Sequence, residues 1–193
     1  MSDTRIRLLH EDDWPDVIAA EERAYAPSGL SEGGAALRSR HRASPSTCFV
    51  LEDADGFCGY LLALPYPLFR CPDLSRAESD GAGRGSSGIG GSSGTGGSNL
   101  HAHDLVIAER ARGRGLADLL LLHLEETGRQ AGYRTLSLVA VRGSQVLWSR
   151  LGYRARPEIG LPASYGTEAV YMAKPLAGPS ADTVPSPSRA EVG

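Results

Sequence analysis

Hydrophobic and polar residues alternate in several short stretches of the chain, and a period of two predicts β-strands. At the start, for example, Ile6 and Leu8 alternate with Arg5 and Arg7. The predicted strands span residues 4–9, 47–51, 57–64, 100–108, 135–141 and 168–172. Between the second and third of these, the sequence Asp-Ala-Asp-Gly predicts a hairpin turn.

Longer segments between the strands have the pattern of helices. Acidic residues precede Trp14, and Pro15 is tolerated in a first turn, so a helix is expected from about residue 10 to Tyr25. The other predicted helices span residues 31–42, 116–131 and 144–151, with Ser31 and Ser144 as N-caps and Gly132 as the C-cap of the leucine-rich one.

All the predicted elements fall within residues 1–176, which are expected to form one domain. Residues 81–98 are nearly all glycine and serine, and this composition predicts a flexible tether within an insertion of about residues 73–98. Both an inert insertion and a lid over a binding site are compatible with it. Residues 177–193 are rich in proline, serine and acidic residues, which predicts a disordered tail.

The bulk composition is that of an ordinary soluble protein, with 41% hydrophobic and 22% charged residues. The net charge of −3 favours neither nucleic acid nor an anionic membrane as a partner. No apolar run approaches the ~20 residues of a membrane span, and the N-terminus lacks a signal-peptide pattern. Cys48, Cys58 and Cys71 are an odd number without metal-ligand spacing, so we expect no metal and a cytoplasmic location.

The turn between the strand at 100–108 and the helix at 116–131 is rich in glycine and arginine. Gly113 and Gly115 let the backbone approach a ligand and point successive N–H groups into one concavity. The helix that follows offers its positive end, and Arg110, Arg112 and Arg114 add charge. The turn therefore predicts a site for an anion such as a diphosphate. The alternative is a solvated arginine turn that binds nothing.

Two familiar phosphate-binding loops do not fit this turn. A dinucleotide fingerprint requires glycine where Asp118 stands, and a Walker loop requires a Gly-Lys-Ser/Thr step that the sequence lacks. The residues from Arg112 to Ala117 instead resemble the Arg/Gln-x-x-Gly-x-Gly/Ala loop of the GNAT superfamily of acetyltransferases. Residues 147–153, Leu-Trp-Ser-Arg-Leu-Gly-Tyr, resemble a second motif of that family, Leu-Tyr-x-x-x-Gly-Phe/Tyr.

The order of the predicted elements also resembles the GNAT order over residues 4–176. The resemblance implies an α/β fold whose mixed, mostly antiparallel sheet is splayed between its fourth and fifth strands and flanked by helices. It implies acetyl-CoA as co-substrate, with the pantetheine arm paired to the strand backbone at residues 105–107. The residues that it places at the CoA site are Leu105, Val106, Ile107, Arg112, Gly113, Arg114, Gly115, Leu116, Ala117, Asp118, Ser144 and Trp148.

His101 and His103 lie on the predicted strand just before the CoA-binding segment. Because side chains alternate along a strand, both are expected on one face with Leu105 and Ile107, with Asp104 on the opposite face. Imidazole can accept a proton near neutral pH, as acetyl transfer to an amine requires. The pair resembles the His-x-His of arylalkylamine N-acetyltransferases, which implies a proton relay through both residues. A purely structural role for the histidines is the alternative.

One position departs from the family pattern. Trp148 stands where the family has a tyrosine that protonates the departing thiolate, and indole cannot exchange a proton at usable pH. Either the thiolate leaves without a dedicated acid, or Tyr153, Tyr165 or Tyr171 supplies the proton. Tyr25 and Tyr165 are further expected to line the acceptor site.

The leading functional hypothesis is an N-acetyltransferase that uses acetyl-CoA to acetylate the primary amine of a small molecule. A protein N-terminal or lysine acetyltransferase is a second hypothesis, although no peptide-reading loop is evident in the sequence. A non-catalytic GNAT module that binds acyl-CoA is a third, and Trp148 is its best support. A monomer and a homodimer are both open alternatives.

Overall fold

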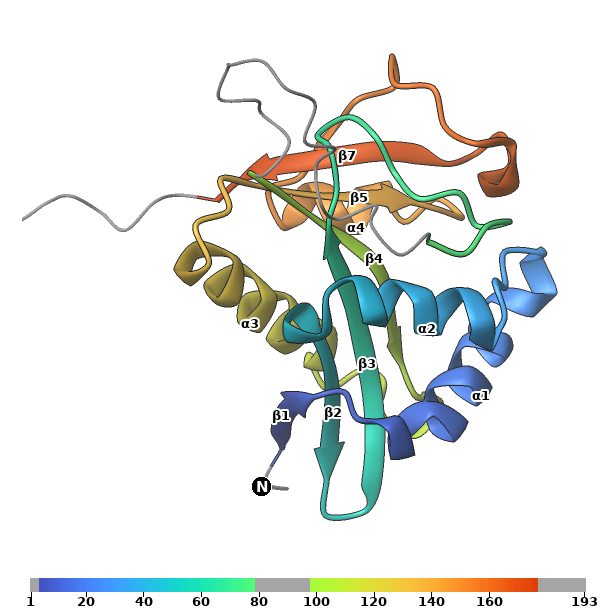
Figure 1. Cartoon of the computed structure of the whole chain (residues 1–193), viewed down its shortest axis with the longest axis vertical. Helices are drawn as coiled ribbons and strands as arrows, with labels where there is room; N and C mark the ends of the chain where they lie inside the picture. Colours follow the sequence, from blue (N-terminus) through green and yellow to red (C-terminus); the bar gives the residue numbers. More distant parts are fainter. Residues whose placement is uncertain (1–3, 79–97, 177–193) are drawn as a thin grey trace, which may run out of the picture.

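A computed structural model describes residues 4–78 and 98–176 of the chain. Its strands are β1 (Arg5–Leu8), β2 (Cys48–Asp53), β3 (Gly56–Pro65), β4 (Asn99–Ile107), β5 (Thr135–Ala140), β6 (Arg154–Ala155) and β7 (Val170–Pro175). Its α-helices are α1 (Trp14–Tyr25), α2 (Gly34–Ala43), α3 (Leu116–Gln130) and α4 (Gln145–Arg150). The strands form one mixed sheet in the order β1-β2-β3-β4-β5-β7-β6, as the predicted α/β fold requires (Figure 1).

The sheet is divided between its fourth and fifth strands. Every neighbouring pair is antiparallel except β4 and β5, which are parallel. These two strands pair only from Asn99 to His101, opposite Thr135 to Ser137. Beyond that point β4 turns away, and β5 and β7 cross above the lower strands (Figure 1). The predicted splay is therefore confirmed, and it opens the sheet along the later half of β4.

Two hydrophobic clusters cover the two faces of the sheet. On one face the leucines of α3, including Leu120 and Leu124, pack against β2, β3, β5 and the start of β4. On the other face Trp14 and Val17 of α1 and Leu37 of α2 pack against the opposite side chains of β2 and β3. Burial of this size is the main stabilising contribution to the fold.

A β-bulge interrupts the alternation of β4. The register with β3 shifts between the pairs Leu62–Asp104 and Ala63–Ala102, which leaves His103 as the additional residue. A bulge of this kind reverses the face that each later side chain takes.

The bulge overturns one expectation about the histidine strand. Leu105 and Ile107 pack in the α3 cluster, whereas His103 contacts residues of the α1–α2 side. The prediction that both histidines share a face with these two residues is wrong. Asp104 lies on the same side as the histidines, because it contacts Tyr60 of the α1–α2 cluster, so its predicted opposite placement is also wrong.

The start of the second helix also differs from the expectation. Gly33, not Ser31, is the N-cap of α2. The Ser31 hydroxyl instead donates to Oε2 of Glu21 in α1, at 2.7 Å. The helix begins later than predicted because a buried carboxylate on α1 competes for the capping side chain.

Part of the predicted insertion packs against the domain. The segment 73–78 is held to α2, since the Glu78 backbone N–H donates to the Ser39 hydroxyl and the Glu78 carboxylate pairs with Arg40. The rest of the predicted tether and the predicted tail at 177–193 lie outside the described residues. Among the residues that are described, no helix has the length and apolar character needed to cross a membrane.

Candidate active site

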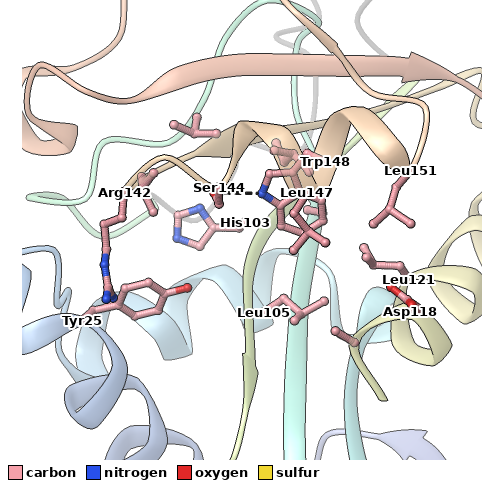
Figure 2. A pocket seen from close by; sticks show the side chains of 15 residues that line it. Tyr25, His103, Leu105, Asp118, Leu121, Arg142, Ser144, Leu147, Trp148 and Leu151 are labelled. Carbon is pink, nitrogen blue, oxygen red and sulfur yellow. Dashed lines mark hydrogen bonds between the residues drawn. The ribbon is translucent and has the colours of Figure 1, made fainter. Parts of the chain in front are cut away.

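A cavity of about 360 Å³ occupies the opening between β4 and β5. Its walls come from both strands, from the first turns of α3, from α4 and from the end of α1 (Figure 2). Of the residues expected at the CoA site, Leu105, Ala117, Asp118, Ser144 and Trp148 line this cavity. Val106, Ile107 and Leu116 instead pack in the hydrophobic clusters. Within the described chain no strand pairs with the edge of β4 that faces β5 after His101, so its backbone is open to the cavity.

The glycine-rich turn has the geometry of an anion site. Gly113 and Gly115 have φ angles of 74° and 72°, a region that favours glycine. Gly115 is the N-cap of α3, and the first backbone bond of the helix runs from the Leu119 N–H to the Gly115 carbonyl at 3.2 Å. The N–H groups before it have no intrahelical acceptor. These unpaired N–H groups include those of Ala117 and Asp118, two residues that line the cavity. A diphosphate would be held at this point of the cavity wall.

Two of the three arginines of the turn form ion pairs within the protein. Arg110 and Arg114 pair with Asp53 at the end of β2, at 3.1 and 2.8 Å. Hydrogen bonds from Arg114 and then Arg110 hold the pKa of Asp53 well below its usual range. The Arg112 Nε donates to the Ile107 carbonyl at 3.3 Å, and Arg112 makes no ion pair within the described chain. The backbone of the turn is therefore better placed than its side chains to bind an anion.

His103 lines the cavity and lies between Tyr25 and Ser144 (Figure 2). Its side chain is fully buried. Nε2 lies 2.5 Å from the Glu32 carboxylate and 3.3 Å from Nε of Arg40. The two contacts require opposite roles of Nε2, because the Arg40 guanidinium can only donate and the Glu32 carboxylate can only accept; the much shorter contact, with Glu32, assigns the proton of the neutral imidazole to Nε2. Nδ1 then carries a lone pair, and it has no hydrogen-bond partner among the described residues.

Glu32 and Arg40 form a charged support behind His103 that the sequence analysis did not identify. Arg40 is 1% exposed and pairs with Glu32 at 2.7 Å and with Glu78 at 2.6 Å. It also donates to the carbonyl oxygens of Asp73 and Arg76, each at 2.9 Å. Burial raises the pKa of Glu32, but His103 and Arg40 together hold it below its ordinary value. The carboxylate is thus kept ionised next to the imidazole.

His101 occupies a different position. It is buried beside the first cavity without lining it, and its Nδ1 lies 2.9 Å from the Ser137 hydroxyl of β5. Its ring stacks on Tyr171 at a centroid distance of 6.2 Å and lies at the same distance from His103. Burial, with the nearby His103 and Arg40, lowers the pKa of His101 well below its ordinary value. His101 is therefore a neutral residue that connects β4 to β5.

A second, smaller cavity of about 50 Å³ meets the first at Tyr25, His103, Val139 and Val141. It is lined on the α1–α2 side by three acidic residues, Glu21, Glu32 and Asp104. Tyr165 also lines it, and Tyr25 lines both cavities.

The three tyrosines that the sequence offers as proton donors to the thiolate, Tyr153, Tyr165 and Tyr171, do not line the first cavity. The Trp148 indole donates to the Ser144 hydroxyl at 3.1 Å, which fixes the ring at the cavity wall (Figure 2). Tyr153 and Tyr171 line neither cavity. Tyr25 is the tyrosine that reaches the first cavity, and burial beside Asp104 raises its pKa well above the ordinary value. A phenol of this kind keeps its proton and acts as a hydrogen-bond donor.

Comparison with known proteins agrees with this geometry. The sequence matches the acetyltransferase (GNAT) family over residues 6–153. No curated protein matches it.

Several solved structures share the fold. The loading GNATL domain of CurA from Lyngbya majuscula is 14% identical with a TM-score of 0.68, covering 90% of this chain and 98% of that one. The GphF GNAT-like decarboxylase, solved with isobutyryl-CoA, is 19% identical with a TM-score of 0.66, covering 90% and 100%. The GNAT family N-acetyltransferase YhbS from Escherichia coli, solved with CoA, is 19% identical with a TM-score of 0.55, covering 92% and 83%. At these identities the likeness concerns the fold.

Proposed function

The chain belongs to the acetyltransferase (GNAT) family, and we propose that it transfers an acetyl group from acetyl-CoA to the primary amine of a small molecule. One observation carries the proposal: His103 lines both the first cavity, between β4 and β5, and the small acidic cavity, and its Nδ1 has no hydrogen-bond partner among the described residues. A base that lines both cavities is within reach of an acyl donor in one cavity and an ammonium in the other.

Acetyl-CoA fits the first cavity in the following way. The N–H groups at the start of α3 would hold the diphosphate, and the open edge of β4 near Leu105 would pair with the pantetheine amides. Two structural neighbours were solved with CoA or isobutyryl-CoA, which supports the same kind of ligand here.

In the proposed reaction His103 accepts a proton and Glu32 stabilises the imidazolium that results. The acceptor ammonium gives one proton to Nδ1 of His103, and its nitrogen then forms a bond to the thioester carbonyl carbon. The carbon–sulfur bond breaks with its electron pair on sulfur, and the second proton of the nitrogen passes to that sulfur. The products are an amide, a free thiol and one proton on the imidazole, which Glu32 stabilises. His101 lines neither cavity and is proposed to position β4 through Ser137.

Turnover of acetyl-CoA with a panel of amines tests this proposal. Acetylation of small primary amines is the expected result. Acetylation of peptides alone would favour a protein acetyltransferase, and acetyl-CoA binding without any turnover would favour a non-catalytic module.

The CoA-binding turn can be tested through Gly115. Replacing Gly115 with valine should weaken acetyl-CoA binding at least tenfold, or about 1.4 kcal/mol, because a branched side chain would cover the backbone where the diphosphate docks. Calorimetry measures the dissociation constant.

A matched control separates this effect from backbone strain. Gly132, just after the other end of α3, also has a positive φ (84°) and open space around its Cβ position. Gly132→Val should therefore lose similar stability while binding acetyl-CoA normally. Equal affinities for the Gly115→Val protein and the wild type would contradict the assignment of the turn.

A further inference from the structure

Three side chains that line the small cavity, those of Asp104, His103 and Tyr165, each have a buried polar atom without a hydrogen-bond partner among the described residues. Asp104 is 7% exposed, and its Oδ2 accepts a hydrogen bond from the Tyr60 hydroxyl. The Tyr25 hydroxyl lies near the carboxylate, yet Oδ1 makes no hydrogen bond within the described chain. Nδ1 of His103 and the Tyr165 hydroxyl are likewise without a partner in the part of the chain that the structure describes. Burial raises the pKa of Asp104 to about 6, so its carboxyl group is mostly ionised above that pH and Oδ1 then accepts a hydrogen bond, as does Nδ1 of an imidazole protonated at Nε2.

The other two carboxylates of the cavity are already satisfied. Glu21 accepts from the Ser31 hydroxyl at 2.7 Å and from the Glu32 N–H at 2.8 Å. Glu32 is bound by His103 through one oxygen and by Arg40 through the other. Asp104 is therefore the carboxylate that has a free oxygen for a ligand, and the two neighbours keep the surroundings negative.

A ligand for this cavity must supply at least two hydrogen-bond donors and favour a negative field. A primary ammonium does so, since it has three N–H donors and a positive charge. We propose that the acceptor presents its primary ammonium on an unbranched alkyl arm, and that Asp104 binds this ammonium while His103 removes its proton. The inference rests on the proposed function and adds the class of acceptor to it.

The small volume of the inner cavity favours an acceptor whose ammonium stands on an unbranched alkyl arm. The small cavity holds about 50 Å³, far below the roughly 300–1,000 Å³ of a pocket for a drug-sized ligand. It shares Leu30, Val141 and Tyr165 with an outer groove of about 400 Å³ between the α1–α2 connection and the segment before β7. These three side chains lie where the two cavities meet, and the apolar side chains of Leu30 and Val141 suit methylene groups there. In this proposal the body of the acceptor lies in the outer groove, and the small volume of the inner cavity disfavours a substituent next to the nitrogen.

Two isomers of one compound test the inference on the wild-type protein. In Nα-acetyl-lysine methylamide the ε-amine is free on an unbranched arm, whereas in Nε-acetyl-lysine methylamide the α-amine is free on a branched carbon. We expect kcat/KM to be at least tenfold higher for the first isomer. The bias of intrinsic reactivity is opposite, because an α-amine with a pKa of about 7.7–8.0 is neutral far more often at pH 8 than an ε-amine with a pKa of about 10.4.

Asp104→Asn tests the binding residue. The amide can still accept from Tyr60, so the fold should persist, but the negative charge is lost. We expect the KM of the unbranched amine to rise at least tenfold, with the dissociation constant of acetyl-CoA changed less than twofold. Asp55→Asn, in the exposed β2–β3 turn, is the matched control and should leave both values unchanged.

The outcomes separate this inference from the proposed function. Efficient acetylation of both isomers, or an unchanged KM in folded Asp104→Asn, would overturn the inference and leave the N-acetyltransferase proposal intact. Acetyl-CoA binding with no acetylation of any amine would overturn the proposed function itself. If Asp104→Asn does not fold, the comparison of the two isomers still decides.

Discussion

Replacing His103 with alanine should lower turnover at pH 7 by about 100-fold or more, the usual contribution of a positioned general base. The affinity for acetyl-CoA should change little, because His103 and Asp118, at the start of α3, lie on different sides of the cavity (Figure 2). His101→Ala should cost less, since His101 lines neither cavity and contacts Ser137 instead. Steady-state kinetics of the two variants, with calorimetry for CoA binding, make the comparison.

The dependence on pH identifies the role of His103. Between pH 7 and pH 9 the neutral fraction of an amine with a pKa of about 10.4 rises close to 100-fold. A protein without its base should therefore recover part of its activity at pH 9. An equal loss at both pH values would assign His103 to substrate positioning, and a wild-type rate in the variant would exclude it from the reaction.

The two histidines also provide a test of coupling. If His101 holds the strand segment that positions His103, the double variant should lose less than the product of the two single losses. Multiplicative losses would show that the two residues act independently.

Local sequence patterns were sufficient to predict the glycine-rich turn and the start of the helix that follows it. The glycine spacing predicted the turn before α3, and both Gly113 and Gly115 have the positive φ angles that such a turn needs. The leucine pattern predicted a helix that begins at Leu116, as it does in the structure. These features depend on neighbours within one or two turns of the chain, so the sequence contains their cause.

The face of the histidine strand could not be predicted in the same way. Strict alternation placed His103 with Leu105, but the bulge opposite Leu62 and Ala63 changes the phase of β4 at that residue. A bulge is decided by the pairing of β4 with β3 and by its divergence from β5. Those contacts join residues about 40 positions apart, such as Leu62 with Asp104 and His101 with Ser137. The local pattern of hydrophobic residues therefore cannot predict them.

The support behind His103 escaped prediction for a related reason. In the sequence, Arg40 is one of several basic residues on a polar helix and has the pattern of a solvated face. In the structure it is buried because segment 73–78 folds over α2 and supplies Glu78 and two carbonyl acceptors. Glu32 lies 71 residues from the histidine that it contacts. Long-range pairs of this kind appear only once the chain is folded.

Arg40→Met should destabilise the protein by about 3–5 kcal/mol at pH 7, because it removes one partner from a buried ion network. Glu32 and Glu78 would remain buried with no guanidinium to balance them. Unfolding in urea, followed at constant ionic strength, measures the loss. Arg76→Met is the matched control: its side chain is 83% exposed and lies 3.9 Å from Asp73, so its removal should cost less than about 0.5 kcal/mol.

The loss from Arg40→Met should also depend on pH in a direction that the network fixes. In the wild type, burial raises the pKa of Glu32, but His103 and Arg40 hold it below the ordinary value. A carboxyl group whose pKa is lower in the folded state than in the unfolded state stabilises the fold at pH values above the unfolded-state pKa. This contribution disappears as the pH falls through the folded-state pKa. Without Arg40, burial raises the pKa of Glu32 with less opposition. The variant therefore loses unfolding free energy at a pH where its buried glutamates are ionised, and it regains part of that free energy where they are protonated. The difference in unfolding free energy should therefore shrink between pH 7 and about pH 4.5, close to the unfolded pKa of glutamate.

A loss of the same size at both pH values would mean that Arg40 acts through packing, and a loss no larger than that of Arg76→Met would mean that the network contributes nothing to stability.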